Sequence, residues 1–175
     1  MHLSLLIEAF LFYNNQITGT IPTEIGNLDK LDWLDMESNQ IDGTIPEELY
    51  SNLALEKVIL KNNSLTGTIS ELVGDLNLLT TFWASFNEIT GTIPTGFGNL
   101  LSLEELELQY NLLTGVIPEE FGNLESIGFL SAENNMLTGT IPSGLFSDNL
   151  QGLRILYLNN NRLTGTVPEN YGRSP

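Results

Sequence analysis

Apolar and polar residues alternate along this chain in a pattern that keeps a fixed distance from a recurring asparagine. An apolar residue stands eight, five and three positions before each asparagine, as Leu103, Leu106 and Leu108 illustrate for the fifth one, and another stands six positions after it. Successive asparagines are 24 residues apart five times and then 26. Period-two alternation predicts a short strand before each asparagine, and the Gly and Pro residues that follow predict a turn. The asparagines are Asn15, Asn39, Asn63, Asn87, Asn111, Asn135 and Asn161.

A unit of this length cannot bury its apolar stripe alone, so we expect the units to stack. Parallel strands of neighbouring units lie about 4.8 Å apart, and seven units would therefore span roughly 30 Å as a curved solenoid. Each asparagine then points inward at the end of its strand, where its amide satisfies backbone groups that water cannot reach. We interpret the asparagines as a structural ladder, and the glycine four positions after each as a turn residue with positive φ.

The repeated unit resembles the 24-residue leucine-rich repeat of plant receptor-like proteins, LxxLxLxxNxLTGxIPxxxGxL, over essentially the whole chain. The resemblance implies an α/β solenoid: a right-handed superhelix with a continuous concave parallel β-sheet and a convex side of short 3-10 turns and loops. The chain departs from this repeat at Ser70, which replaces Pro, at Asp42, which replaces Thr, and at Leu53, which stands one position late. It also lacks the paired cysteines that cap plant ectodomains of this class.

The resemblance further implies a single domain over residues 1–175 with about seven repeats. Neither end carries a polar capping unit, although solenoids normally cover their ends with atypical repeats. We expect Phe10, Phe12, Ile17 and Ile21 to face an open edge of the core. The chain is therefore expected to be a fragment of a longer array, with neighbouring repeats or domains at both ends.

Composition excludes several classes of function. The chain has 22 Asp and Glu against 6 Lys and Arg, a net charge of −16, which disfavours nucleic acids and anionic membranes as partners. It has no Cys, so neither a thiolate nucleophile nor a Cys-ligated metal is available. No apolar run approaches the ~20 residues of a membrane-spanning helix, and no glycine-rich phosphate loop is present. We expect no cofactor, no metal and no catalytic residue.

The candidate binding surface is the concave sheet, where the residues six, four and two positions before each asparagine point away from the core. Aromatic and acidic residues at these positions, with two aromatics just before the asparagine, suggest a surface that recognises a protein or peptide with basic groups. Glu37 and Lys61 occupy one row on adjacent strands and are expected to pair. The structural alternative is that the aromatics only stabilise the strands through cross-strand pairs. The predicted contact residues are Trp33, Asp35, Glu37, Ile59, Lys61, Trp83, Phe86, Glu105, Glu107, Tyr110, Phe129, Glu133 and Tyr157.

Two chemical alternatives concern the acidic residues of this face. Glu105 and Glu107, two positions apart on one strand, have the spacing of a glycosidase pair, but an open sheet offers no pocket that excludes water. With Glu133 they could contribute to a Ca²⁺ site, which needs six or more converging oxygens. A solvated acidic face fits the pattern better than either.

A second surface is suggested by threonines that follow the turn glycines. The first column holds Thr20, Thr44, Thr68, Thr92, Thr140 and Thr166, with Val116 in the fifth unit, and the second column holds Thr18, Thr66, Thr90, Thr114, Thr138 and Thr164. Threonines in columns about 4.8 Å apart resemble the flat flank of an ice-binding solenoid. The bland alternative is that Thr suits an exposed short strand. A carbohydrate-binding flank and a structural spacer are the remaining hypotheses.

The sequence gives little information on the cellular localisation of the protein. The family resemblance implies a cell-surface or secreted protein, although the apolar segment 3–13 carries Glu8 and lacks the basic start of a signal peptide. Asn62, Asn63 and Ser64 form an N-glycosylation sequon. Asn63 belongs to the expected ladder, whereas Asn62 is expected to point outward.

Overall fold

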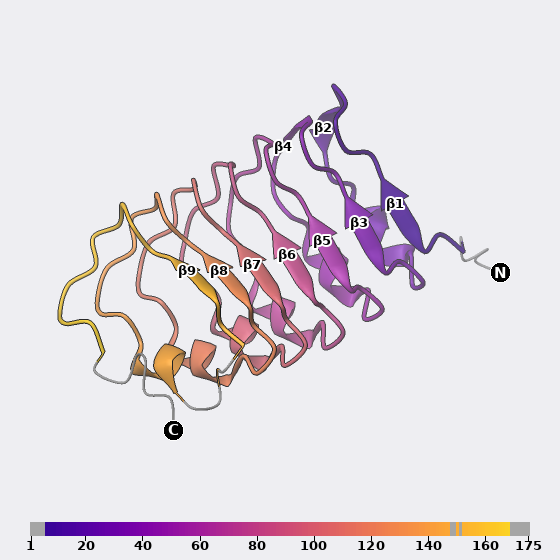
Figure 1. Ribbon diagram of the computed structural model, residues 1–175. Helices are drawn as coiled ribbons and strands as arrows, with labels where there is room; N and C mark the ends of the chain where they lie inside the picture. The colour runs from indigo at the N-terminus through magenta and orange to yellow at the C-terminus, as the bar shows by residue number, and fades with distance from the viewer. Residues whose placement is uncertain (1–5, 148–149, 151, 169–175) are drawn as a thin grey trace.

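The computed structural model describes residues 6–147, 150 and 152–168, and these fold into a curved stack of similar coils (Figure 1). One parallel sheet of seven strands runs along one side, in the order β1-β3-β5-β6-β7-β8-β9. The predicted solenoid with a continuous parallel sheet is confirmed. The strands are β1 (Ala9–Leu11), β3 (Trp33–Asp35), β5 (Lys57–Ile59), β6 (Thr81–Trp83), β7 (Glu105–Glu107), β8 (Phe129–Ser131) and β9 (Ile155–Tyr157).

Equivalent residues of neighbouring repeats lie side by side in this sheet. Trp33 pairs with Lys57, which pairs with Thr81, so the register follows the 24-residue spacing of the sequence. The two extra residues of the last interval leave the pairing of Phe129 with Ile155 unchanged. Side chains of one type therefore form straight rows across the concave face. A second ladder of two short strands, β2 (Thr18–Thr20) and β4 (Gln40–Asp42), lies on the flank of the first two repeats.

Short 3-10 helices form the convex side. Five of them follow a proline in an extended conformation, because proline fixes φ and lacks the N–H group that a helix start leaves unpaired. The exception begins after Ser70, whose Oγ accepts a hydrogen bond from the Leu72 amide at 3.3 Å. A capping hydroxyl thus replaces the proline. The helices are η1 (Thr23–Asn27), η2 (Glu47–Ser51), η3 (Glu71–Asp75), η4 (Thr95–Asn99), η5 (Glu119–Asn123) and η6 (Ser143–Phe146).

The core lies between the sheet and these helices. Its leucines are almost completely buried, as Leu103, Leu106 and Leu108 are, at 0–1% exposure. Phe82 is fully buried and packs edge-on against Phe97, with ring centroids 5.1 Å apart. A large ring therefore fills the core in the repeat where the small Ala84 occupies a position usually held by leucine.

The second repeat differs from the others in its buried residues, because its leucine stands one position late. Leu53 is 60% exposed, and Asn52 takes the buried place that a leucine holds after the other helices. The Asn52 amide donates to the Ile25 carbonyl oxygen at 2.9 Å, which compensates one of its buried polar atoms. Tyr50 stands in η2 where four of the other helices have glycine, and burial raises the pKa of its phenol.

The asparagines form a ladder inside the turn that follows the sheet. Asn111 donates to the Ala84 carbonyl of the preceding repeat at 2.9 Å and to its own Leu108 carbonyl at 3.1 Å. Its Oδ1 accepts from the Ile89 amide at 3.0 Å. The same bonds recur at the five other internal positions, as at Asn63. Asn15 bonds only to carbonyls of its own repeat.

The first repeat exposes part of the apolar surface that the sequence predicts at its edge. Phe12 and Ile17 are each 38% exposed. Phe10 is half-buried and packs edge-on against Phe12. Ile21 is an exception, because it is only 4% exposed and belongs to the core. No helix in the described part of the chain is long and apolar enough to cross a membrane.

Candidate functional site

The concave sheet brings the predicted contact residues together in rows across its strands. In one row Trp33, Lys57, Thr81, Glu105, Phe129 and Ile155 are successive partners, and in the next Asp35, Ile59, Trp83, Glu107, Ser131 and Tyr157 are. The alternation within each three-residue strand turns the middle side chain inward and the outer two toward this face. The geometry of the strands therefore sets which residues can meet a ligand.

Lysines cover both tryptophans of the face. Lys57 Nζ lies 4.4 Å from the centre of the Trp33 ring, and Lys61 Nζ lies 5.4 Å from that of Trp83. These distances are typical of cation–π contacts. The indole N–H groups of both tryptophans are covered and have no acceptor among the described residues. The N-terminal half of the face therefore holds its own cations against its own rings.

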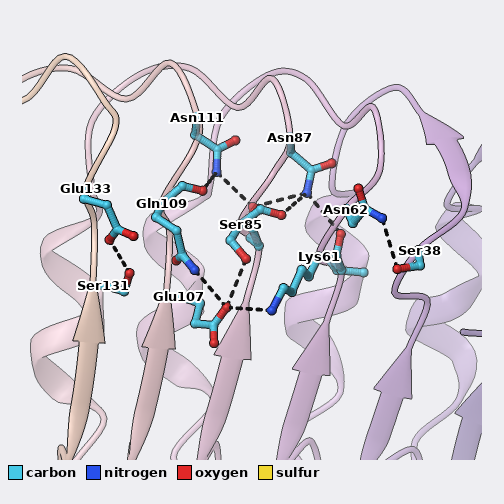
Figure 2. A network of polar contacts seen from close by, with 12 residues as sticks. Ser38, Lys61, Asn62, Ser85, Asn87, Glu107, Gln109, Asn111, Ser131 and Glu133 are labelled. Atoms are coloured by element: carbon cyan, nitrogen blue, oxygen red, sulfur yellow. Dashed lines mark hydrogen bonds and ion pairs between the residues drawn. The ribbon is translucent and has the colours of Figure 1, made fainter. Parts of the chain in front are cut away.

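Glu107 is the centre of a polar network at the ends of β5, β6 and β7 (Figure 2). Its Oε2 lies 3.3 Å from Lys61 Nζ and accepts hydrogen bonds from Ser85 Oγ at 3.1 Å and from Gln109 Nε2 at 3.0 Å. The expected pairing of Lys61 with Glu37 is therefore wrong. Ser85 lies between the two residues, just beyond the end of β6, and is short and fully buried. The long lysine side chain therefore reaches across it to Glu107 on β7.

Two predicted contact residues expose little surface. Asp35 is 7% exposed and Ile59 is 6% exposed; Ile59 lies in its row between Asp35 and the large Trp83. Asp35 Oδ1 accepts a hydrogen bond from the Glu37 amide at 3.1 Å, so its carboxylate serves the local backbone. These two residues support the face rather than offering contact area to a partner.

The other acidic residues do not assemble a metal site. Glu133 accepts a hydrogen bond from the Ser131 hydroxyl on its own strand, and Glu105 stands two residues before Glu107 in a different row. Within the residues that the structure describes, no group of three or more His, Cys, Asp or Glu side chains is placed to hold a metal ion. This arrangement gives no support to the Ca²⁺ alternative.

Phe86 and Tyr110 form an exposed aromatic pair at the strand ends. Their rings stack at 4.4 Å with an interplanar angle of 14°, and they are 42% and 47% exposed. Both have positive φ, 56° and 54°, a conformation unfavourable for bulky side chains. Equivalent positions in the other five repeats hold Asn four times and Ser once, and Asn tolerates this conformation. At two places these residues are joined between neighbouring repeats by a side-chain hydrogen bond: Asn62 donates to Ser38 at 3.1 Å, and Asn160 donates to Asn134 at 2.9 Å.

A second aromatic pair lies on β8 and β9. The rings of Phe129 and Tyr157 meet edge-on at 5.9 Å, and Tyr157 is 48% exposed. The sequence placed all four of these aromatics on the concave side but carried no signal for their mutual contacts. Whether two rings stack depends on side-chain torsions that a single sequence does not encode.

The threonine flank separates into two columns with different environments. Hydroxyls of Thr66, Thr90, Thr114, Thr138 and Thr164 donate to glycine carbonyls of the preceding repeat at 3.0–3.3 Å. The hydroxyls of the other column, such as those of Thr44 and Thr68, are exposed and make no hydrogen bond within the described part of the chain. The Thr44 methyl instead packs on Gly67, where a Cβ would lie 2.6 Å away. Val116 keeps this methyl contact, at Gly139.

A carboxylate on the convex side also shows a clear electrostatic effect. Glu71 accepts hydrogen bonds from the Gly96 amide at 2.8 Å, the Thr95 amide at 3.2 Å and the Thr95 hydroxyl at 3.1 Å, and so covers the start of η4. Desolvation is the largest single cause and raises the pKa of its carboxyl, but the three hydrogen bonds together outweigh it, and the pKa lies below its usual value. Glu71 stabilises the stack and is remote from the concave face.

Comparisons with known proteins agree with this architecture. Family models described as leucine-rich repeat match residues 7–28, 30–52, 79–137 and 152–173. A search of curated protein sequences found no match.

Solved structures extend the comparison. The ectodomain of the Arabidopsis thaliana membrane receptor kinase GASSHO1/SCHENGEN3, in complex with CASPARIAN STRIP INTEGRITY FACTOR 2, is similar over 93% of this chain and 19% of its own, with 39% identity and a TM-score of 0.90. The plant peptide hormone receptor RGFR1, in complex with RGF2, is similar over 91% and 25%, with 37% identity and a TM-score of 0.88. A plant ice-binding protein is similar over 87% and 57%, with 28% identity and a TM-score of 0.74. The chain thus spans about a fifth to a quarter of the two receptors.

Proposed function

The chain belongs to the leucine-rich-repeat family, and from that premise we propose that it is a non-catalytic recognition module whose concave sheet binds a protein or peptide. The observation that carries the proposal is the exposed Phe86–Tyr110 stack beside the Glu107 network. A bulky side chain with positive φ costs free energy on the order of 1–3 kcal/mol, and such strain concentrates at binding sites. Two neighbouring repeats carry this cost where five use Asn or Ser.

The composition of the face supports binding rather than chemistry. Large aromatics with intermediate exposure are typical of the centres of protein interfaces. Ser85, Gln109 and Ser131 are buried and fix the side chains beside them, which gives the face a preorganised polar surface. The proposed ligand is an extended peptide or a protein segment that lies across several strands.

Charge favours a partner with basic groups. The net charge is −16, and Lys57 and Lys61 are already held by rings of this chain, Lys61 also by Glu107. Complementary charges speed association and fix register more than they raise affinity. Two of the similar structures are receptor ectodomains solved with CASPARIAN STRIP INTEGRITY FACTOR 2 and with RGF2, which is consistent with peptide recognition on this fold.

The test uses a displayed library of random twelve-residue peptides selected on the immobilised protein. Replacing the strained pair by the residue that other repeats use, Phe86→Asn with Tyr110→Asn, keeps the backbone conformation and removes the rings. We expect binding of the selected peptides to fall at least tenfold in this double variant. Leu101→Ser, at a residue that is 52% exposed and outside the sheet, is the control. Equal binding by both variants and the unaltered protein would refute the proposal.

The threonine flank supports a second candidate function, ice binding. The supporting observation is that the first threonine column presents hydroxyls to solvent that make no hydrogen bond with any residue the structure describes, in register from repeat to repeat. A similar solved structure is that of a plant ice-binding protein. Thermal hysteresis and ice shaping by the unaltered protein, lost in Thr68→Tyr with Thr92→Tyr, would support this function. An unaltered protein with neither effect would exclude it.

A further inference from the structure

The two halves of the concave face differ in how their aromatic rings are supplied with cations. On β3, β5 and β6 each tryptophan has its own lysine, Trp33 with Lys57 and Trp83 with Lys61. On β7, β8 and β9 the outward positions hold two carboxylates, two aromatic rings, Ser131 and Ile155, but no Lys or Arg. The C-terminal half therefore has carboxylates and rings that could bind a cation, but, unlike the N-terminal half, it has no lysine of its own at these positions.

Lys61 shows how a ring and a carboxylate of this face bind a cation together. Its ammonium group lies against the Trp83 ring and 3.3 Å from the Glu107 carboxylate, so a ring and a carboxylate on neighbouring strands hold one cation between them. Glu105 and Phe129 stand as direct partners on β7 and β8, one strand further along. They bring a carboxylate and a ring equally close, at the strand spacing of about 4.8 Å.

An independent observation at the same place is a buried acceptor without a donor. Gln109 is only 8% exposed, and its Nε2 donates to Glu107, while its Oε1 has no hydrogen-bond partner among the described residues. An unpaired buried acceptor destabilises the free protein. Figure 2 shows the Gln109 amide between Glu107 and the Ser131–Glu133 pair. Nearby acceptors therefore outnumber donors.

We propose that this half of the concave sheet is a subsite for one arginine side chain of the bound peptide; this rests on the proposed function. The guanidinium group lies against the Phe129–Tyr157 pair and donates to the carboxylates of Glu105 and Glu133 and to Gln109 Oε1. The ligand's donors thus reach Gln109 Oε1, which has no donor among the described residues, and Glu133, which accepts only from the Ser131 hydroxyl among them.

Arginine fits this arrangement better than lysine or a metal ion. The acceptors are spread over two strands and two rows, and a planar guanidinium with five N–H donors can reach several of them at once, whereas an ammonium group is a compact point charge. Guanidinium planes also stack on aromatic rings. The acidic side chains of the described residues do not converge on a point, as a metal ion requires.

The experiment is an NMR titration of the ¹⁵N-labelled protein with the peptide acetyl-Gly-Arg-Gly-amide. The same peptide with citrulline in place of arginine is the neutral isostere, and a lysine peptide tests the choice of cation. We expect shifts concentrated on β7, β8 and β9 for the arginine peptide, weaker binding for the lysine peptide and none for the citrulline peptide. Because charged contacts are screened, 0.5 M NaCl should weaken the binding.

Two charge-matched variants locate the subsite. Glu133→Gln removes one acceptor carboxylate and should weaken binding of the arginine peptide roughly three- to tenfold. Glu119→Gln removes the same charge from η5 on the convex side and should leave binding unchanged. Unaltered spectra away from the substituted residue verify that both variants fold.

The outcomes separate this inference from the proposed function. Equal binding of the citrulline peptide, or equal effects of the two variants, would overturn the arginine subsite. So would a selected library free of arginine whose members still require Phe86 and Tyr110, and in that case peptide recognition itself would stand. If neither the arginine peptide nor any library peptide binds the concave face, both proposals fail.

Discussion

At the scale of single residues, the asparagine ladder joins neighbouring repeats through side-chain hydrogen bonds to backbone groups. Each internal asparagine satisfies a carbonyl of the preceding repeat and an amide in its turn, and at Asn111 these groups are buried. Buried backbone groups need partners because water cannot reach them. The ladder thus makes the position of one repeat depend on the next, and its energetics can be tested at its ends and its centre.

We predict that Asn111→Ala destabilises the protein far more than Asn15→Ala. The first substitution leaves the Ile89 amide without its side-chain acceptor and removes one of the two asparagine donors to the Ala84 carbonyl, Asn87 being the other, so it should cost about 2–4 kcal/mol. Asn15 is exposed and bonds only within its own repeat, so its loss should cost under about 1 kcal/mol. Urea denaturation of both variants measures the difference. Similar losses at the two positions would contradict this role of the ladder.

Glu71 predicts a pH dependence with a definite sign. Its pKa is lowered in the folded protein from the ordinary value of 4.5, so its contribution is fully present above that value and is lost as the pH falls through the lower folded pKa. The difference in Tm between the unaltered protein and Glu71→Gln should therefore be constant above about pH 5.5 and shrink toward zero in more acidic solution. Glu119→Gln, a variant with the same net charge, is the control. A difference that grows on acidification would contradict the assignment.

At the scale of elements, each threonine of the first column of the flank both packs against the next repeat and faces solvent. The methyl group packs on the glycine of the next repeat, while the hydroxyl faces solvent. Gly67 illustrates the constraint, because it has a φ of 75° and no room for a Cβ beside the Thr44 methyl. Packing therefore explains a β-branched residue with a methyl group, but it does not explain the hydroxyl.

Val116 provides the corresponding substitution. Val116→Thr keeps the methyl that contacts Gly139 and adds a hydroxyl at a position that is 56% exposed, so the free energy of unfolding should change by less than about 0.5 kcal/mol. If the flank binds ice, the completed column should raise thermal hysteresis above that of the unaltered protein. Lower hysteresis in a stable variant would show that the hydroxyl column is not the ice-binding surface.

The elements were predictable from the sequence because they depend on spacing, whereas the site depends on side-chain reach. The 24-residue period determined the strands, the turns and the rows, including the side of the sheet to which Trp83 and Glu107 point. The partner of Lys61 was not predictable, because the lysine crosses a whole strand over Ser85. Ile59 was assigned to the outer face correctly, but its burial there depends on the sizes of its neighbours.

At the scale of the whole molecule, the stack has an interior and two edges, and its stability should vary accordingly. Each internal strand pairs with two neighbours, whereas β1 and β9 pair with one. The edges are also less well packed, since the inward side chains of β1 and β9, Phe10 and Leu156, are only partly buried, whereas those of the strands between them are 0–1% exposed. In a linear array the stability of a repeat depends on its own fold and on contacts with its nearest neighbours.

Native-state hydrogen exchange should therefore show a gradient along the solenoid. We predict that amides of β6 and β7, such as that of Leu106, exchange slowest, because exposing them requires disruption of repeats on both sides. Amides of β1 and β9 should exchange fastest among the strands, through fraying that leaves the centre folded. Low concentrations of urea should accelerate exchange of central amides more steeply than that of edge amides, because opening the centre exposes more surface. Uniform exchange across all seven strands would mean that the repeats unfold as one cooperative unit, although each strand pairs only with its neighbours in the sheet.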